Sequence, residues 1–151
     1  MRYLIHTAML GAFAFLVSCS SGNDLINCPP LSAPIEGARA FVLTDEFKQI
    51  VDVRLNGVRA QCAVSSDGGV LMEIKAGMKM TRDLTQNAEA DIAVVPMMTA
   101  VLDANDTVLS NNMFSYKNGF DTDLNRLLQV AEFELVVPMD GRAVISLTPN
   151  Y

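Results

Sequence analysis

The chain has 151 residues and carries 17 acidic side chains against 11 basic ones, which gives a formal net charge of −6. An acidic surface disfavours nucleic acids and anionic lipid headgroups as partners. No stretch of the sequence is rich in Lys or Arg, and we therefore expect no basic cluster and no nucleic-acid binding.

The N-terminal segment has the pattern of a secretory signal peptide. Arg2 precedes an apolar run from Leu4 to Val17, and small residues follow the run. This run is shorter than the roughly 20 apolar residues that a membrane-spanning helix needs. We expect residues 1–18 to be a cleaved signal peptide. Cleavage by the ordinary signal peptidase, or retention as an N-terminal anchor, are the alternatives.

Leu16, Ser18 and Cys19 resemble the lipobox of bacterial lipoproteins, which has Leu three positions before the cysteine and a small residue directly before it. The resemblance implies that Cys19 carries a covalent lipid and becomes the first residue of the mature chain. Two or more acyl chains make a lasting anchor. Ser20 rather than Asp follows the cysteine, which in the enterobacterial sorting rule implies the outer membrane. We therefore expect an outer-membrane lipoprotein of the cell envelope that faces the periplasm.

The mature chain, residues 19–151, is long enough for one domain with a core of its own. Removal of Arg2 and His6 leaves ten basic residues, 17 acidic residues and no histidine, a formal balance of −7. Without histidine there is no Ser-His or Cys-His pair to activate a nucleophile. No local motif supports a Ser-Lys dyad or a carboxylate pair. We expect no enzymatic activity and no cofactor beyond the lipid on Cys19.

Cys28 and Cys62 are the two cysteines left after lipidation of Cys19. In an oxidising compartment such a pair favours a disulfide, which would stabilise the fold by roughly 3–4 kcal/mol in the chain-entropy model. Two separate buried thiols are the alternative. Residues 19–34 are polar and then Pro-rich, which predicts a tether. A bridged Cys28 would leave only the residues from Cys19 to Cys28 free, about 30 Å at full extension.

Strand patterns fill the predicted domain, residues 35–151. After a short apolar run at 38–43, Val51, Val53 and Leu55 alternate with polar residues, which predicts a half-buried strand. Asn56-Gly57 then predicts a two-residue hairpin turn. This turn would place residues 51 and 62 opposite each other, with Cys62 and all the apolar positions of 51–64 on one inward face.

Further strand patterns follow the turn cluster at 65–69. Residues 70–80 alternate most regularly, and 81–90 predict a polar loop. Residues 91–102 are apolar almost throughout, which predicts a strand buried on both faces, with Pro96 at an edge or bulge. Residues 107–116 return after a turn at 103–106. Leu124, Leu127 and Leu128 have helical spacing and predict a helical turn within 121–128.

Two final strands are predicted around residues 133–137 and 143–147, with Pro138 and Asp140-Gly141 between them. No long amphipathic helix interrupts the series. Seven or eight strands at this spacing indicate an all-β sandwich or barrel. We predict an immunoglobulin-like or fibronectin-III-like β-sandwich.

Two groups of residues are candidate metal ligands. Asp103, Asn105 and Asp106 offer oxygen ligands for calcium, with Asp121 and Asp123 further along the chain, but tight turns favour Asp and Asn for their own hydrogen bonds. Four methionines offer thioether ligands for copper(I), although those at alternating positions fit core packing better. They are Met78, Met80, Met97 and Met98. We predict turn and core roles, and no metal site.

Several segments of the domain also resemble a family of small alphaproteobacterial envelope lipoproteins of uncharacterised function. They are the Cys62 strand, Arg82, residues 95–103, Val108-Leu109 and Val136-Val137-Pro138. Met97 stands where that family has an aromatic residue. The resemblance implies fold and location only.

Together these features predict a lipid-anchored, non-enzymatic interaction module of the periplasm and outer membrane, involved in envelope assembly or maintenance. Its partners would be the membrane, through the lipid, and an envelope protein. A periplasmic carrier of a small ligand or metal ion is the alternative.

Overall fold

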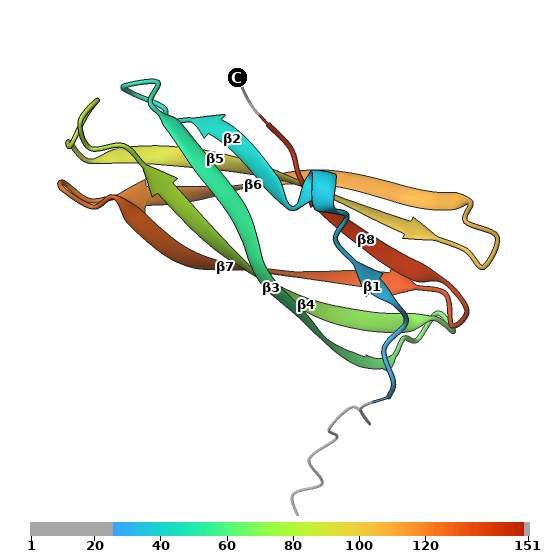
Figure 1. Ribbon diagram of the computed structural model, residues 1–151. Coiled ribbons are helices and arrows are strands. Elements are labelled where there is room, and N and C mark those ends of the chain that lie inside the picture. Colours follow the sequence, from blue (N-terminus) through green and yellow to red (C-terminus); the bar gives the residue numbers. More distant parts are fainter. Residues whose placement is uncertain (1–25, 150–151) are drawn as a thin grey trace, which may run out of the picture.

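The computed structural model describes residues 26–149, which form an all-β sandwich (Figure 1). The predicted signal peptide and Cys19 lie outside the described residues. Eight strands follow one another: β1 (Leu31–Ser32), β2 (Arg39–Leu43), β3 (Ile50–Val64), β4 (Val70–Arg82), β5 (Asp91–Leu102), β6 (Val108–Phe120), β7 (Arg126–Val137) and β8 (Arg142–Leu147).

The strands form two four-stranded sheets, in the orders β1-β8-β5-β6 and β2-β3-β4-β7. All pairs are antiparallel except β1 with β8, which is parallel. The predicted all-β sandwich is therefore confirmed. A single turn of 3-10 helix, η1 (Ile35–Gly37), precedes β2, and the described part of the chain has no helix that could span a membrane.

The core lies between the two sheets and is built by alternation along the strands. The predicted inward positions of β4 are all buried, with at most 2% of each side chain exposed: Val70, Met72, Ile74, Ala76, Met78 and Met80. Burial of such side chains stabilises the fold by roughly 25 cal/mol for each Å² of apolar surface removed from water. The regular apolar pattern of residues 70–80 was thus a reliable guide to the core.

Asn56 and Gly57 form a bulge rather than the predicted hairpin turn. Strand β3 continues through them, and its partner throughout is β4. Leu55 pairs with Met78 and Val58 pairs with Ala76, so two residues of β3 lie opposite the single residue Gly77. Gly57 has a φ of +96°, and a Cβ on Gly77 would lie 2.8 Å from the carbonyl oxygen of Asn56. The bulge therefore depends on glycine in both strands.

The bulge keeps the inner face of β3 apolar along its length. Inward positions have odd numbers up to Leu55 and even numbers from Val58 onward, because the extra residue shifts the alternation by one. Cys62 points inward as predicted, with 2% of its surface exposed. Val64, predicted to be inward, is exposed because it is the last residue of the strand.

Strand β5 is buried on one face only, which corrects the prediction of a strand buried on both faces. Its odd-numbered residues face the core, whereas Ile92 and Met98 on the other face are 42% and 37% exposed. Pro96 does not mark a bulge or an outer edge strand, because β5 lies between β8 and β6. It lies one residue before the segment of β5 that pairs with β8, and its carbonyl accepts the N–H of Thr148. The missing N–H of proline is not needed at that point.

Residues 121–125 form a turn, and the predicted helical turn within 121–128 is wrong. The N–H of Leu124 donates to the carbonyl of Asp121, and β7 begins at Arg126. Leu127 and Leu128 consequently lie on opposite faces of a strand: Leu127 packs against the core, and Leu128 is 55% exposed. Tertiary pairing with β4 overrides the helical spacing of these leucines.

Residues 26–34, within the predicted tether, are attached to the sandwich. The N–H of Ile26 donates to the carbonyl of Cys62 at 2.9 Å, Cys28 is joined to Cys62 by a disulfide, and β1 pairs with β8. These contacts connect the N-terminal end of the described chain to both sheets.

Arg82, at the end of β4, organises the loops at one end of the sandwich. The residue is 4% exposed, and its guanidinium donates hydrogen bonds to four backbone carbonyls. The acceptors are Leu124 at 2.8 Å, Glu89 at 2.6 Å, Ala88 at 3.3 Å and Asp121 at 2.8 Å. The group also lies 5.0 Å from the centre of the Phe120 ring. One side chain therefore connects the loop after β4 to the turn between β6 and β7.

The R82K substitution should be strongly destabilising despite its conserved charge. An ammonium group cannot reproduce the planar set of donors, and buried carbonyls would lose their partners. We expect the free energy of unfolding to fall by about 2–4 kcal/mol, measured by urea denaturation. R142K is the matched control, because Arg142 pairs with exposed Asp106 and should lose under about 1 kcal/mol. Equal losses for the two variants would contradict the role of Arg82.

Candidate functional site

The residues predicted as sites have structural roles wherever they fall within the described chain. Cys28 and Cys62 form the predicted disulfide, with their Cα atoms 5.3 Å apart. Cys19 lies outside the described residues. Met72, Met78, Met80 and Met97 are core side chains, each at most 1% exposed, whereas Met98 points to the outer face of β5. Met78, Met80 and Met97 belong to one cluster of the core, and Met98 lies on the other side of the sheet.

Asp103, Asn105 and Asp106 shape the turn between β5 and β6. The Asp103 carboxylate accepts the N–H groups of Asn105 and Thr107, both at 2.8 Å. The hydrogen bond from Thr107 is the main cause of a lowered pKa at Asp103. Asp106 has a φ of +63° and pairs with Arg142 at 2.9 Å. Among residues 26–149, no group of three or more His, Cys, Asp or Glu side chains is placed to hold a metal ion.

The outer face of the β2-β3-β4-β7 sheet gathers charged side chains that are far apart in the sequence, and we call it the charged face. Six of the ten basic residues that follow residue 18 lie on it: Arg39, Arg54, Arg59, Lys75, Lys79 and Arg126. The expectation that no basic cluster exists was therefore wrong. Strand pairing, which a linear search for Lys and Arg cannot detect, brings these residues together.

The basic end of the charged face lies beyond the bulge, toward the start of β3. Arg39, Arg54 and Lys79 are direct cross-strand neighbours in one row. Asp52 lies in the next row and bridges the two arginines, with N–O distances of 2.8 Å to each. A hollow of about 230 Å³ is lined by Asp52, Arg54, Lys79 and Thr81. Positive charge thus exceeds negative charge at this end.

Lys79 and Arg126 are the basic residues of this end whose side chains make no hydrogen bond or ion pair with the rest of the described chain. Thr81 is the cross-strand partner of both Asp52 and Arg126, so these three residues share one row. The Arg126 side chain is exposed. Lys79 is half-buried beside the hollow. Two cations without internal partners on an acidic protein are available to an anionic group from another molecule.

Asp52 is the one acidic residue at the basic end. Partial burial raises its pKa, but hydrogen bonds from Arg39 and Arg54 and the charges of both arginines outweigh this effect, so the pKa lies below its ordinary value. The carboxylate is therefore ionised at neutral pH and holds both guanidinium groups in place. Arg39 in turn lies 4.7 Å from the centre of the Phe41 ring.

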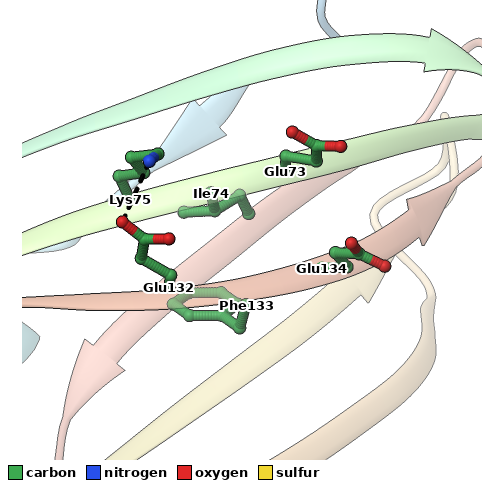
Figure 2. Close-up of a pocket in the computed structure, with 6 residues that line it drawn as sticks. All are labelled: Glu73, Ile74, Lys75, Glu132, Phe133 and Glu134. Carbon is green, nitrogen blue, oxygen red and sulfur yellow. Dashed lines mark hydrogen bonds and ion pairs between the residues drawn. The ribbon is translucent and has the colours of Figure 1, made fainter. Parts of the chain in front are cut away.

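The acidic end of the charged face lies on the other side of the bulge (Figure 2). Lys75 and Glu132 are cross-strand partners and form an ion pair at 2.9 Å. Glu73 and Glu134 are also directly opposite each other, and their carboxylates point to the same side of the sheet as the ion pair. Like charges at directly opposite positions destabilise a sheet. Ile74, between Glu73 and Lys75 of β4, points to the opposite side and is buried.

The charged face presents charges of both signs on one side of the sheet. It combines a basic end, an acidic end and a central row with Gly77 and exposed Val130. The pattern of the sequence contained one usable signal: basic residues recur at exposed positions of β3 on both sides of the bulge, at Arg54 and Arg59. The other basic residues of the charged face are recognised only from the pairing of β3 and β4 with each other and with β2 and β7.

Comparison with known proteins identifies no relative of this chain. No protein-family model matches the chain, and searches of the curated proteins and of the solved structures find no match. The function is therefore inferred from the residues of this chain alone.

Substitution of Glu134 by Lys should stabilise the protein. The change replaces the opposed pair Glu73 and Glu134 by an attractive pair, and we expect the free energy of unfolding to rise by about 0.2–1 kcal/mol at low salt. E134Q, which only removes the repulsion, should gain less. At about 1 M salt both gains should shrink because the charges are screened. A loss of stability for E134K at low salt, measured by urea denaturation, would contradict the proposed repulsion.

Asp52 should make the stability of the protein dependent on acidic pH. Because its folded-state pKa is lowered, the carboxylate stabilises the fold above its ordinary pKa near 3.8, and this contribution is lost as the pH falls through the folded-state value. D52N should therefore cost up to about 1 kcal/mol at pH 7 and less below pH 4. Urea denaturation at both pH values measures the gap, and a gap that widens in acid would refute the assignment.

Proposed function

We propose that the chain is a lipid-anchored, non-enzymatic interaction module of the bacterial cell envelope, located at the periplasmic side of the outer membrane. The resemblance of residues 16–19 to a lipobox supports the anchor on Cys19. The disulfide between Cys28 and Cys62 fits an oxidising compartment. The proposal also includes membership of the small family of alphaproteobacterial envelope lipoproteins that the sequence resembles.

We further propose that the sandwich has an immunoglobulin-like arrangement. The neighbours β3-β4-β7 correspond in order to strands A-B-E of that fold, and β8-β5-β6 correspond to F-C-C′. The pairs β4 with β7 and β5 with β8 are antiparallel, as the corresponding pairs B-E and C-F are. Strand β1 takes the place of strand G but runs parallel to its neighbour. Domains of this architecture are common as binding modules, which agrees with the proposed role.

The charged face is the observation that carries the proposed interaction. A chain with a formal charge of −6 concentrates most of its basic residues on one side of one sheet. The side chains of Lys79 and Arg126 have no partner there among residues 26–149. The partner we propose is an envelope protein that presents carboxylates to this basic end. Complementary charge of this kind increases the rate of association and selects the partner.

The position of the basic end supports a protein partner over the lipid surface. Arg54 and Cys62 lie on the same strand, eight residues apart, which corresponds to roughly 25 Å. The disulfide at Cys62 marks the end of the domain where the N-terminal segment enters. The basic end is thus roughly 25 Å from the point where the N-terminal segment enters the domain, a separation that favours contact with a protein of the envelope.

A crosslinking pull-down from detergent-solubilised membranes tests the proposal. The full chain carries its native signal peptide and a tag after Tyr151, and it is compared with K79E/R126E. We expect one reproducible envelope protein with the natural sequence and at least tenfold less of it with the double variant. K48E/K117E is the matched control, because it makes the same charge change at exposed positions outside the charged face, and it should retain the partner.

Two results would count against the proposal. Equal recovery of the partner by K79E/R126E and K48E/K117E would exclude the basic end as the binding surface. Failure of the natural chain to incorporate labelled palmitate, with C19S as the unlabelled control, would exclude lipidation of Cys19 as the anchor.

A further inference from the structure

Strand edges can pair with strands of other molecules, and the two sheets leave four edge strands: β1, β2, β6 and β7. Natural proteins protect such edges by keeping them short or by placing charges on them. β1 has two residues and β2 has five, whereas β7 carries Arg126, Glu132 and Glu134. β6 is the exception, because it has 13 residues and only Lys117 is charged.

The unprotected segment of β6 runs from Ser110 to Tyr116. It contains no charge and no proline, and its pairing with β5 is regular. A bulge at Leu109 bounds it on one side and Lys117 bounds it on the other. Met113 lies at its centre and is 68% exposed. This segment therefore has the features that favour addition of another strand.

Pairing with β5 determines which residues of β6 direct their backbone N–H and C=O groups toward β5 and which direct them away from the sheet. The carbonyl of Pro96 points toward the β8 side, where it accepts the N–H of Thr148, so the backbone groups of the next residue, Met97, point toward β6. Met97 pairs with Phe114, and even-numbered residues of β6 therefore bond to β5. Free N–H and C=O groups point away from the sheet at the residues between them: Asn111, Met113 and Ser115.

We propose that two copies of this chain associate by antiparallel pairing of β6 with β6, with the two-fold axis at Met113. Met113 of one copy then lies opposite Met113 of the second copy, and Asn111 lies opposite Ser115. This register joins residues whose backbone groups are free, and about six new hydrogen bonds form. The two sheets that contain β6 become one continuous eight-stranded sheet, a symmetric contact that closes as a dimer.

Side chains favour a second copy of this chain over an unrelated strand. Met98 of β5 is the cross-strand neighbour of Met113, and both are on the outer face of the sheet, 37% and 68% exposed. The dimer aligns four methionines in one row across the two copies, which removes apolar surface from water. Lys117 falls opposite Leu109 of the second copy, so no like charges are opposed. The segment is therefore self-complementary in this register.

Pairing through a single strand edge buries little surface, and we expect a weak dimer that depends on concentration. The association is independent of the lipid anchor and of the charged face. Confinement of both copies to one membrane would raise their effective concentration.

Cysteine crosslinking in the full chain, expressed with its native signal peptide, tests the register. Cα atoms of a hydrogen-bonded pair are about 5.5 Å apart, within the reach of a disulfide. M113C should give an interchain disulfide dimer on a non-reducing gel. N111C and S115C should each remain monomeric alone and should crosslink to each other when co-expressed. A monomeric M113C, or self-crosslinking of N111C as efficient as that of M113C, would overturn the proposal.

A second variant tests the dimer without added cysteines. M113K places like charges opposite each other at the two-fold axis, and the detergent-solubilised protein should become monomeric by light scattering at concentrations where the natural sequence dimerises. V130K is the matched control, since Val130 is an exposed residue of edge strand β7, 56% exposed, and this variant should still dimerise. Unchanged melting temperatures establish that both variants fold. A natural sequence that stays monomeric at all concentrations, or an M113K variant that still dimerises, would refute the pairing.

Discussion

The architecture depends on one extra residue in β3. Without the bulge at Asn56-Gly57, the alternation of this fifteen-residue strand would turn Val58, Ala60 and Cys62 toward solvent and Arg59 toward the core. Gly77 makes room for the bulge, because only a residue without Cβ tolerates the carbonyl of Asn56 at that distance. The same bulge keeps Arg54 and Arg59 on one outer face. The core, the disulfide and the charged face thus share a single geometric requirement.

The spacing of apolar residues was sufficient to predict most strands. It failed where two different structures produce the same spacing. A two-residue hairpin and a bulge both shift the alternation by one, so Asn56-Gly57 could not distinguish them, and only the identity of the partner strand decides. Leu124, Leu127 and Leu128 fit a helix by spacing, but residues 126–128 pair with the end of β4. In β5, apolar side chains at Ile92 and Met98 suggested burial on both faces, although the outer face is covered by no other sheet. These errors all arise from tertiary pairing, which a single sequence does not contain.

The charged face shows the same limit for function. Its residues come from four strands that are spread over most of the domain, and β7 reaches its place beside β4 only after two strands of the other sheet. Counting charges along the chain indicated an acidic protein, which is true of the whole and misleading for this face. From sequence alone, Asp52 is one of the polar residues that alternate with Val51, Val53 and Leu55 in a predicted strand. Its role becomes visible only when Arg39 and Arg54 are seen on either side of it.

The disulfide determines how a mechanical load would enter the domain. A force applied to the chain before Cys28 cannot peel β1 from β8, because the covalent bond carries it directly to Cys62. There it meets β3, a fifteen-residue strand that is hydrogen-bonded to β4 over most of its length and to β2 near its start. Residues 29–61, which include β1, β2 and most of β3, are enclosed by the bond and cannot be extended while it is intact. A force from the N-terminal side would therefore load the domain at Cys62, near the end of its longest strand, rather than at β1, its shortest.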